Sequence, residues 1–362
     1  MQQISLKKSV NILFLLFLIF SGLYFARPFL VPLTLAAIVS MLLLPLSRYL
    51  ERRGLNNVVA ALISVSGILF VMAGLVSLLA WQLSDIVSDF TQIQQKIGEL
   101  SEQLKSFLST KLGISAEEQK KILESQAPSG SKGISVVAAV AGMGVDFVLV
   151  LVYIFIFLYF RGHLKKFVLR LVPVDRMPKT EGIIHDASKV AHKYLSGLAL
   201  MIAGLWIMYG IGFSIVGIEN AFFFAILCGI LEIVPFVGNL TGTVITAFMA
   251  ASQGGSTMVF GVIATYFIVQ FIQSYILEPL VVGSEVNINP LFTIIGLVAG
   301  EMLWGIAGLI LAIPLLGITK IICDNVEPLK PYGFLIGGGE KKKENPLKKK
   351  IKDWILKFKG QG

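Results

Sequence analysis

The sequence contains few charged residues and little cysteine or histidine. Of its 362 residues only 15% are charged and 55% are hydrophobic, with two cysteines and three histidines. A soluble domain carries about 25% charged residues, so a water-soluble fold is excluded. Cys228 and Cys323 both lie in apolar context, which predicts two small buried side chains and no disulfide framework. We expect no cofactor and no metal site.

The sequence also lacks the motifs of ATP hydrolysis and of hydrolytic catalysis. It contains no Gly-x-x-x-x-Gly-Lys-Ser/Thr, no His-Glu-x-x-His and no Gly-x-Ser-x-Gly. We therefore expect a protein that is not an enzyme and that does not use ATP by itself.

Long apolar runs are what the sequence has instead. A membrane-spanning helix needs about 20 apolar residues, whereas the strands of a membrane barrel alternate apolar and polar residues. The runs here are apolar throughout, and the mean hydropathy is +0.80. This predicts an all-α polytopic integral membrane protein. Ordinary spans are expected at residues 10–25, 29–50, 58–83, 134–160, 194–216 and 258–277.

The basic residues indicate how the chain crosses the membrane. They concentrate at Lys7 and Lys8, around 48–53, in 161–193 and in the C-terminal tail. Segment 161–193 has eight basic and three acidic residues, whereas 84–133 has six basic and seven acidic residues. Basic loops stay on the cytoplasmic side. We expect a multi-pass protein of the bacterial cytoplasmic (inner) membrane with both termini in the cytoplasm.

Composition divides the chain into four regions. Residues 1–83 are N-terminal transmembrane helices, and 84–133 form an extracytoplasmic amphipathic helical segment. Residues 134–323 form the candidate transport core, which includes the cytoplasmic basic segment 161–193. Residues 324–362 are a cytoplasmic basic tail, which contributes much of the net charge of +9. The tail is either a basic amphipathic helix on an anionic lipid leaflet or a solvated extension, and nucleic-acid binding explains it poorly.

Apolar residues in the polar segment recur at alternating spacings of four and three. This heptad spacing is typical of a coiled coil. Two interpretations remain open: one amphipathic helix on the surface of this protein or of the membrane, or helices that meet across a subunit interface. The residues of this candidate oligomer seam are Ile86, Phe90, Ile93, Ile97, Leu100, Leu104 and Phe107.

Two apolar blocks, 221–251 and 291–323, are each too long for one straight crossing. An acid and a group of helix breakers interrupt each block near its middle, around Glu232 and Pro235 in the first and around Glu301 in the second. Proline removes a backbone amide, and glycine permits a sharp reversal. Each block is either a kinked full span or a re-entrant hairpin. Hairpins are slightly favoured, because each block is long enough for two half-depth helices.

Paired interrupted segments are typical of the substrate sites of transporters built from repeats. A carboxylate inside a membrane is costly and is a functional candidate by default. The alternatives are that the two glutamates are hydrogen-bonded structural residues and that Asp146 lies at the outer interface. The candidate substrate or ion pathway residues are Glu232, Pro235, Gly238, Asn239, Gly300, Glu301 and Asp146.

Several short motifs occur in a fixed order along the chain. They are Pro28…Pro32…Pro45…Glu51-Arg-Arg-x-Leu55, Glu232-x-x-Pro235-Phe-Val-Gly238, Gln273-x-x-x-x-Glu278-Pro279-x-x-x-Gly283, Asn289-Pro290 and Trp304-Gly305-x-x-Gly308-x-x-x-x-x-Pro314. Their order and spacing over residues 10–330 resemble the autoinducer-2 exporter family of bacterial permease-like membrane transporters. Asn289-Pro290 is a departure, because the family often has His-Pro there.

The resemblance implies about eight membrane segments, two of them the broken or re-entrant blocks, and a homo-oligomer, taken as a pentamer. Some members of the family are linked to autoinducer-2 export and others to sodium/proton antiport. We therefore expect a secondary transporter that exports a small solute under an ion gradient. The alternative is a sodium (lithium)/proton antiporter, and the alternative of another class is a non-transporting scaffold or channel. The expected partners are membrane lipids, including an anionic leaflet at the tail, and a small-molecule or ion substrate.

Overall fold

Helices make up all the regular elements in the described part of the chain, which confirms the all-α prediction. The structure is a computed structural model and describes residues 6–88, 132–234, 237–282 and 288–338. The elements are α1 (Leu6–Phe25), α2 (Arg27–Arg52), α3 (Asn57–Ser88), α6 (Lys132–Arg170), η1 (Val174–Arg176), α7 (Met177–Val216), α8 (Ala221–Leu231), α9 (Val237–Ile272), the π-helical η2 (Gln273–Val282), α10 (Pro290–Asn325), η3 (Glu327–Leu329) and α11 (Lys330–Ile336).

Six helical segments in the described ranges are long and apolar enough to cross a membrane. Two further helices, α1 and α8, are apolar but contribute shorter segments. The chain is therefore a multi-pass membrane protein. The six segments are Arg27–Arg52, Asn57–Leu79, Asp146–Arg170, Val174–Val216, Gly238–Glu278 and Pro290–Asn325.

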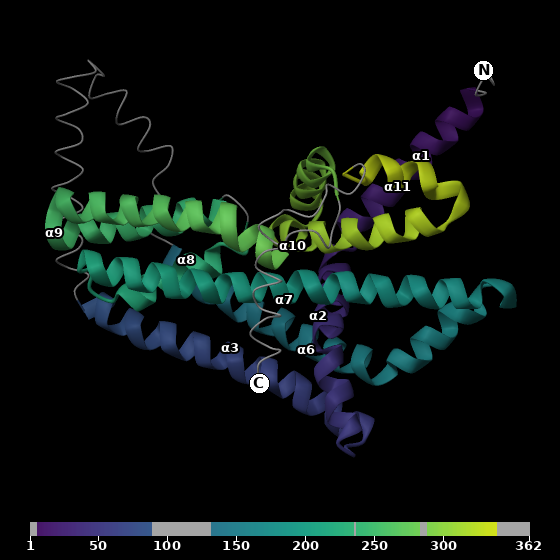
Figure 1. Ribbon diagram of the computed structural model, residues 1–362, viewed down its shortest axis with the longest axis horizontal. Helices are drawn as coiled ribbons and strands as arrows, with labels where there is room; N and C mark the ends of the chain where they lie inside the picture. The colour runs from purple at the N-terminus through teal and green to yellow at the C-terminus, as the bar shows by residue number, and fades with distance from the viewer. Residues whose placement is uncertain (1–5, 89–131, 235–236, 283–287, 339–362) are drawn as a thin grey trace, which may run out of the picture.

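Helix α7 is the element around which the others are arranged. In Figure 1 it runs along the molecule, with α9 beside one half, α10 beside the other, and α2, α3 and α6 on the opposite side. Its 40 residues make it about 60 Å long, twice the roughly 30 Å of a bilayer core. The expected span 194–216 is only its C-terminal part. The basic segment 161–193 forms the end of α6, the start of α7 and their connection.

The C-terminal ends of α2 and α6 lie together. Arg161 donates through Nη2 to the carboxylate of Glu51 and through Nη1 to Ser47 Oγ at 3.2 Å. At the other end of the pair, the rings of Phe29 and Tyr153 meet edge to face at 6.4 Å. Phe29 contacts Tyr153, and the later residue Glu51 contacts the later residue Arg161. The helices α2 and α6 therefore run parallel. The basic segments that the charge pattern assigned to one side of the membrane are thus neighbours.

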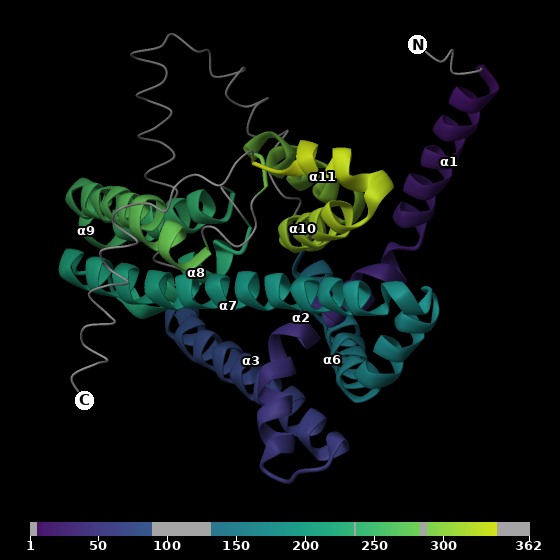
Figure 2. The same cartoon turned by 45° about the vertical axis from the view of Figure 1, so that its right-hand side comes forward.

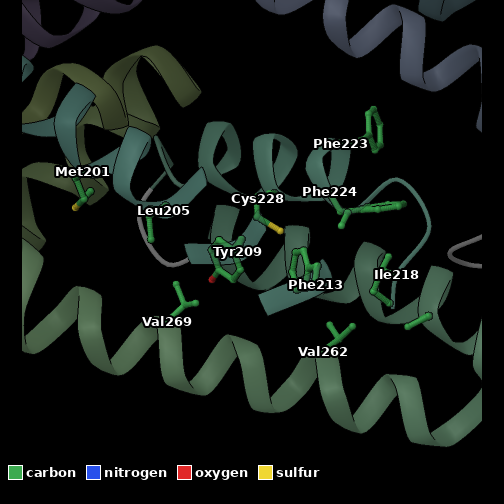
Figure 3. Close-up of a cluster of buried hydrophobic side chains, with 13 residues drawn as sticks. Met201, Leu205, Tyr209, Phe213, Ile218, Phe223, Phe224, Cys228, Val262 and Val269 are labelled. Atoms are coloured by element: carbon green, nitrogen blue, oxygen red, sulfur yellow. The ribbon is translucent and has the colours of Figure 1, made fainter. Parts of the chain in front are cut away.

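The largest buried cluster joins α7, α8 and α9. Figure 3 shows Tyr209 and Phe213 of α7 between Cys228 of α8 and Val262 of α9. Both aromatic rings are fully buried, and they stack on each other at 5.3 Å. A second cluster holds α2, α3 and α6 together, and a third joins α2 and α7 to α10. The helices on the two sides of α7 thus share it as their common support.

The first interrupted block reverses direction. Gly242 packs against Cys228, and Gly238 lies so close to Leu231 that a side chain at 238 would overlap the carbonyl of residue 231. Going from residue 238 to 242 along α9, the contacted residue moves back from 231 to 228 along α8. The helix α8 and the first arm of α9 (residues 237–253) are therefore antiparallel. A second turn at Gly254 and Gly255 divides α9, whose second arm (residues 256–272) returns along α7.

The second interrupted block also turns back, at Gly305, which has φ 60° and ψ −139°. The backbones of Gly300 and Gly308 touch, and Gly296 packs against Leu316. A straight helix would hold residues 296 and 316 about 30 Å apart. The chain therefore turns back within both blocks, whereas a re-entrant position of these turns in a membrane stays a prediction.

We predict that Gly308→Ala destabilises the protein, because its new methyl group meets the rigid backbone of Gly300. Overpacking of this kind costs about 1–3 kcal/mol. The matched control is Gly74→Ala on α3, where nothing lies within 4 Å of the added atom. Replacing glycine by alanine inside a helix, at a position with no close neighbour, stabilises the helix by up to about 1 kcal/mol. Thermal unfolding in detergent checks both variants, and equal shifts of the same sign would contradict the hairpin packing.

Candidate functional site

Glu232 lies at the turn that follows α8, where it occupies the C-cap position. Its carboxylate Oε1 accepts a hydrogen bond of 2.7 Å from Nε2 of Gln273. Gln273 is only 5% exposed and is the first residue of the π-helical segment η2. The turn between two antiparallel helices is thus held against a third segment by a carboxylate–amide pair. Segments of π-helix occur frequently at functional sites.

Asn239, in the first turn of α9, extends this contact. Its side chain is 3% exposed, and its Oδ1 accepts a hydrogen bond of 2.8 Å from the hydroxyl of Tyr209. Its Nδ2 donates to Oε1 of Gln270, and Nε2 of Gln270 donates to Oγ of Ser274 at 3.4 Å. We refer to Tyr209, Glu232, Asn239, Gln270, Gln273 and Ser274 as the polar cluster.

Two oxygens of the polar cluster remain without a hydrogen bond from the described residues. They are Oε2 of Glu232 and Oε1 of Gln273, and both are buried. Buried polar atoms in folded proteins are nearly always hydrogen-bonded, so each exception calls for an explanation. Both atoms are acceptors, and acceptors are satisfied by a proton, a hydrogen-bond donor or a cation.

The glycine at 238 is what allows this geometry. Any side chain there would overlap the backbone of Leu231, so glycine lets α9 begin directly against the end of α8. Asn239, the next residue, is then directed towards α7. Pro235 lies outside the described residues. Three of the residues predicted for a substrate pathway, Glu232, Gly238 and Asn239, therefore occupy one turn.

Gly300 and Glu301 belong to a different place. Glu301 is exposed and lies near the turn of the α10 hairpin. At that turn Trp304 Nε1 donates a hydrogen bond of 3.0 Å to the carbonyl of Leu23 in α1. Among the described elements α10 packs mainly on α1, α2, α7 and α11. The structure does not bring Glu301 into contact with the polar cluster, and its role in a pathway stays a prediction.

Asp146 is also separate from the polar cluster. It is exposed on α6 and lines a groove against α2, with Arg27 on the other wall. The candidate seam from Phe90 onward and the basic tail beyond residue 338 lie outside the described residues. Within the ranges that were described, no group of three His, Cys, Asp or Glu side chains is suitable for a metal ion.

Sequence reasoning did not assign Tyr209, Gln270 or Gln273 to the site. The two glutamines carry a usable signal, because amides three residues apart in an apolar helix share one face. Gln273 did stand in one of the family-like motifs. Tyr209 carries no such signal, because its partner Asn239 is thirty positions away in the sequence.

We predict that Tyr209→Phe lowers the free energy of unfolding by about 1–3 kcal/mol, because it leaves the buried Asn239 Oδ1 without its hydroxyl donor. Tyr275→Phe is the matched control, since Tyr275 is 71% exposed. Denaturation of the purified proteins in one detergent compares the two. Equal stability of both variants would contradict the hydrogen bond between Tyr209 and Asn239.

A multi-pass helical membrane protein with a buried polar cluster at a helix reversal has the features of the transporter class. Comparison with known proteins assigns it within that class. Residues 12–327 match the model of the AI-2E family transporter, and the chain belongs to this family. Transporter families are in general not enzymes, in line with the missing catalytic motifs. The matched range ends before the lysine-rich tail, which was not part of the resemblance.

The chain is similar over most of its length to several bacterial proteins. It is 24% identical over 326 residues to YrrI of Bacillus subtilis, covering 87% of this chain and 91% of YrrI. It is 25% identical over 335 residues to YhhT of Escherichia coli K12, covering 91% and 94%. Both names give transport as a provisional assignment. The AI-2 transport protein TqsA of Escherichia coli K12 is 23% identical over 326 residues, covering 88% and 92%.

Proposed function

We propose that this protein is a secondary transporter that exports a small solute, with the polar cluster on the pathway of the solute or of its coupling ion. The observation that carries the proposal is the pair of buried acceptor oxygens on Glu232 and Gln273 that accept no hydrogen bond from the described residues. A carboxylate in this environment costs folding free energy. A cost of this kind is retained where the group binds something during function.

The length of α8 supports a position of Glu232 near the middle of the membrane. Its 11 residues extend about 16 Å, roughly half of the 30 Å hydrocarbon core. If α8 enters at one interface, the turn at Glu232 lies near mid-depth. Irregular backbone at that depth is tolerated where protein or a water-filled cavity surrounds it. Known transporters place their sites at such discontinuous helices.

The proposed arrangement has eight membrane segments. Five are single helices in the N-terminal part of the chain, and three follow in the order hairpin, span, hairpin. We place the protein in the bacterial cytoplasmic (inner) membrane with both termini in the cytoplasm, as the basic residues indicate. We propose a homo-oligomer, a pentamer by family resemblance, with the seam at 86–107. The segments are α1, α2, α3, α6, α7, α8 with the first arm of α9, the second arm of α9 with η2, and α10.

The first substrate to test is autoinducer-2, because one relative is named as an AI-2 transport protein. The absence of an ATP-binding motif favours coupling to an ion gradient. A proton or a sodium ion on Glu232 would provide that coupling, since either satisfies its free carboxylate oxygen.

The second candidate function is sodium or lithium/proton antiport, with the ion itself as the substrate. Carboxylate and amide oxygens are ligands that hard cations prefer, and the Glu232–Gln273 pair offers both. Asp146 is a further candidate for the proton pathway. The candidate of another class, a scaffold or channel, differs in that any flux through it would not depend on a gradient of a second ion.

We predict that Glu232→Gln reduces transport to background, because glutamine keeps the size of the side chain but removes the charge and the titratable oxygen. Everted membrane vesicles from expressing cells provide the assay. Energised uptake of autoinducer-2 reports export, and dye quenching after addition of NaCl or LiCl reports antiport. The result identifies which of the two functions depends on Glu232.

Glu219→Gln is the matched control, because Glu219 is an exposed acid just before α8 and is expected to transport normally. Glu301→Gln in the same assay asks whether the second hairpin also lines the pathway. Normal flux in Glu232→Gln at equal expression contradicts the assignment of the site. Flux of wild type without any ion gradient contradicts secondary transport and favours a channel.

A further inference from the structure

A groove of about 600 Å³ runs between α2 and α6, away from the polar cluster. One wall is formed by residues of α2, including Val31, Leu35 and Val39, and the other includes Val150 of α6. Figures 1 and 2 both show α2 and α6 side by side.

The two charged residues in the described lining of the groove lie at the same end. Arg27 is the first residue of α2, and Asp146 is the first residue of the parallel helix α6 in the described lining. Beyond them the walls are apolar. From Arg27 to Val39 the groove follows α2 for 12 positions, or about 18 Å. The hydrocarbon of one leaflet is about 15 Å thick. The groove is therefore charged at one end and apolar along the rest of its length, which is close to the thickness of one leaflet.

The width of the groove selects among possible occupants. A volume of about 600 Å³ over about 18 Å gives a mean cross-section of about 33 Å². An α-helix about 10 Å wide occupies about 80 Å², so it is wider than this mean cross-section, and a second copy lying over the open side is an outcome of the test below. A single extended hydrocarbon chain does fit. The protein spans a membrane whose lipids carry chains of this kind.

The charges then indicate the head group. Arginine presents a planar fork of donors that matches a phosphate, and an exposed carboxylate accepts from an ammonium group. Arg27 and Asp146 are both exposed, so both are accessible to such a head group. A lipid with phosphate and ammonium together satisfies both charges, whereas an anionic lipid leaves the carboxylate opposed by a like charge.

We propose that the α2–α6 groove binds one zwitterionic phospholipid of the phosphatidylethanolamine type. Its phosphate lies on Arg27, its ammonium lies on Asp146, and one acyl chain runs along Val31, Leu35 and Val39. The site rests on observations separate from the polar cluster. It offers lipid binding as a role for Asp146 that competes with the proton pathway considered above.

The test is the amount of phospholipid that stays with the full-length protein through purification in a mild detergent, measured for each head group by mass spectrometry. Wild type is expected to retain one phosphatidylethanolamine per chain. Arg27→Gln and Asp146→Asn each weaken retention about tenfold or more, the loss of one charge-assisted hydrogen bond. Val31→Trp fills the groove and removes the lipid.

Two controls match these variants. Arg53→Gln removes an arginine that lies over Tyr49 at 5.0 Å, just as Arg27 lies over Tyr24 at 5.1 Å, but Arg53 is outside the groove. Val148→Trp adds the same bulk to α6 at a residue that is 58% exposed and does not line the groove. Both controls are expected to retain the lipid.

Three outcomes would overturn the proposal. They are unchanged phosphatidylethanolamine in Arg27→Gln and Val31→Trp, preferential retention of phosphatidylglycerol, or a disulfide between two copies of a Val31→Cys variant in membranes. The last result would mean that another protomer covers the groove. Arg27 lies at an exposed helix end, so its variant keeps the test valid if Val31→Trp does not fold.

Discussion

The lipid bilayer offers no hydrogen-bond partners to a polypeptide, and this constraint governs where the chain turns. Every reversal of an apolar helix exposes amides and carbonyls that protein must cover or that must line a cavity. The chain meets this demand with glycine. Gly238 brings α9 directly against the end of α8, and Gly300 and Gly308 bring the two arms of α10 into backbone contact. The long helix α7 supports the reversals by packing against both hairpin regions.

One of these reversals is more than a structural turn. Around Glu232 the chain places a carboxylate and several amide side chains where apolar side chains would be more stable. Tyr209 and Asn239 satisfy each other, and Gln270 and Ser274 extend the chain of hydrogen bonds. Glu232 and Gln273 each keep one buried oxygen without a donor in the described residues. The second reversal, at Gly305, shows no comparable buried network among the described residues, and its acid is exposed. The two blocks look alike in sequence but differ in chemistry.

Much of this architecture can be predicted from sequence, because span length and side-chain polarity are local properties. The apolar runs located the helices, and the basic residues grouped the ends of α2 and α6 on one side. The reversals could not be chosen over kinks, because exchanging both architectures together leaves the tail on the same side of the membrane. Whether an acid is buried is set by packing. Glu232 lies against Gln273 of η2, forty-one positions further along the chain, whereas Glu301 is exposed, so similar local patterns ended in different surroundings. Tyr209 was missed for the same reason.

The central claim is that the turn after α8 borders an aqueous pathway inside the membrane. The decisive measurement is the reaction of single-cysteine variants in intact membranes with a membrane-impermeant maleimide, after Cys228 and Cys323 are replaced by alanine. Val234→Cys lies in the partly exposed turn, and Phe248→Cys lies on the first arm of α9 at a residue that is 58% exposed. We expect cysteine at 234 to react from the aqueous phase and cysteine at 248, on an exposed apolar face of the helix, to remain unreacted. Protection of 234 with labelling of 248 would show that lipid or protein closes the turn, and it would contradict the proposed pathway.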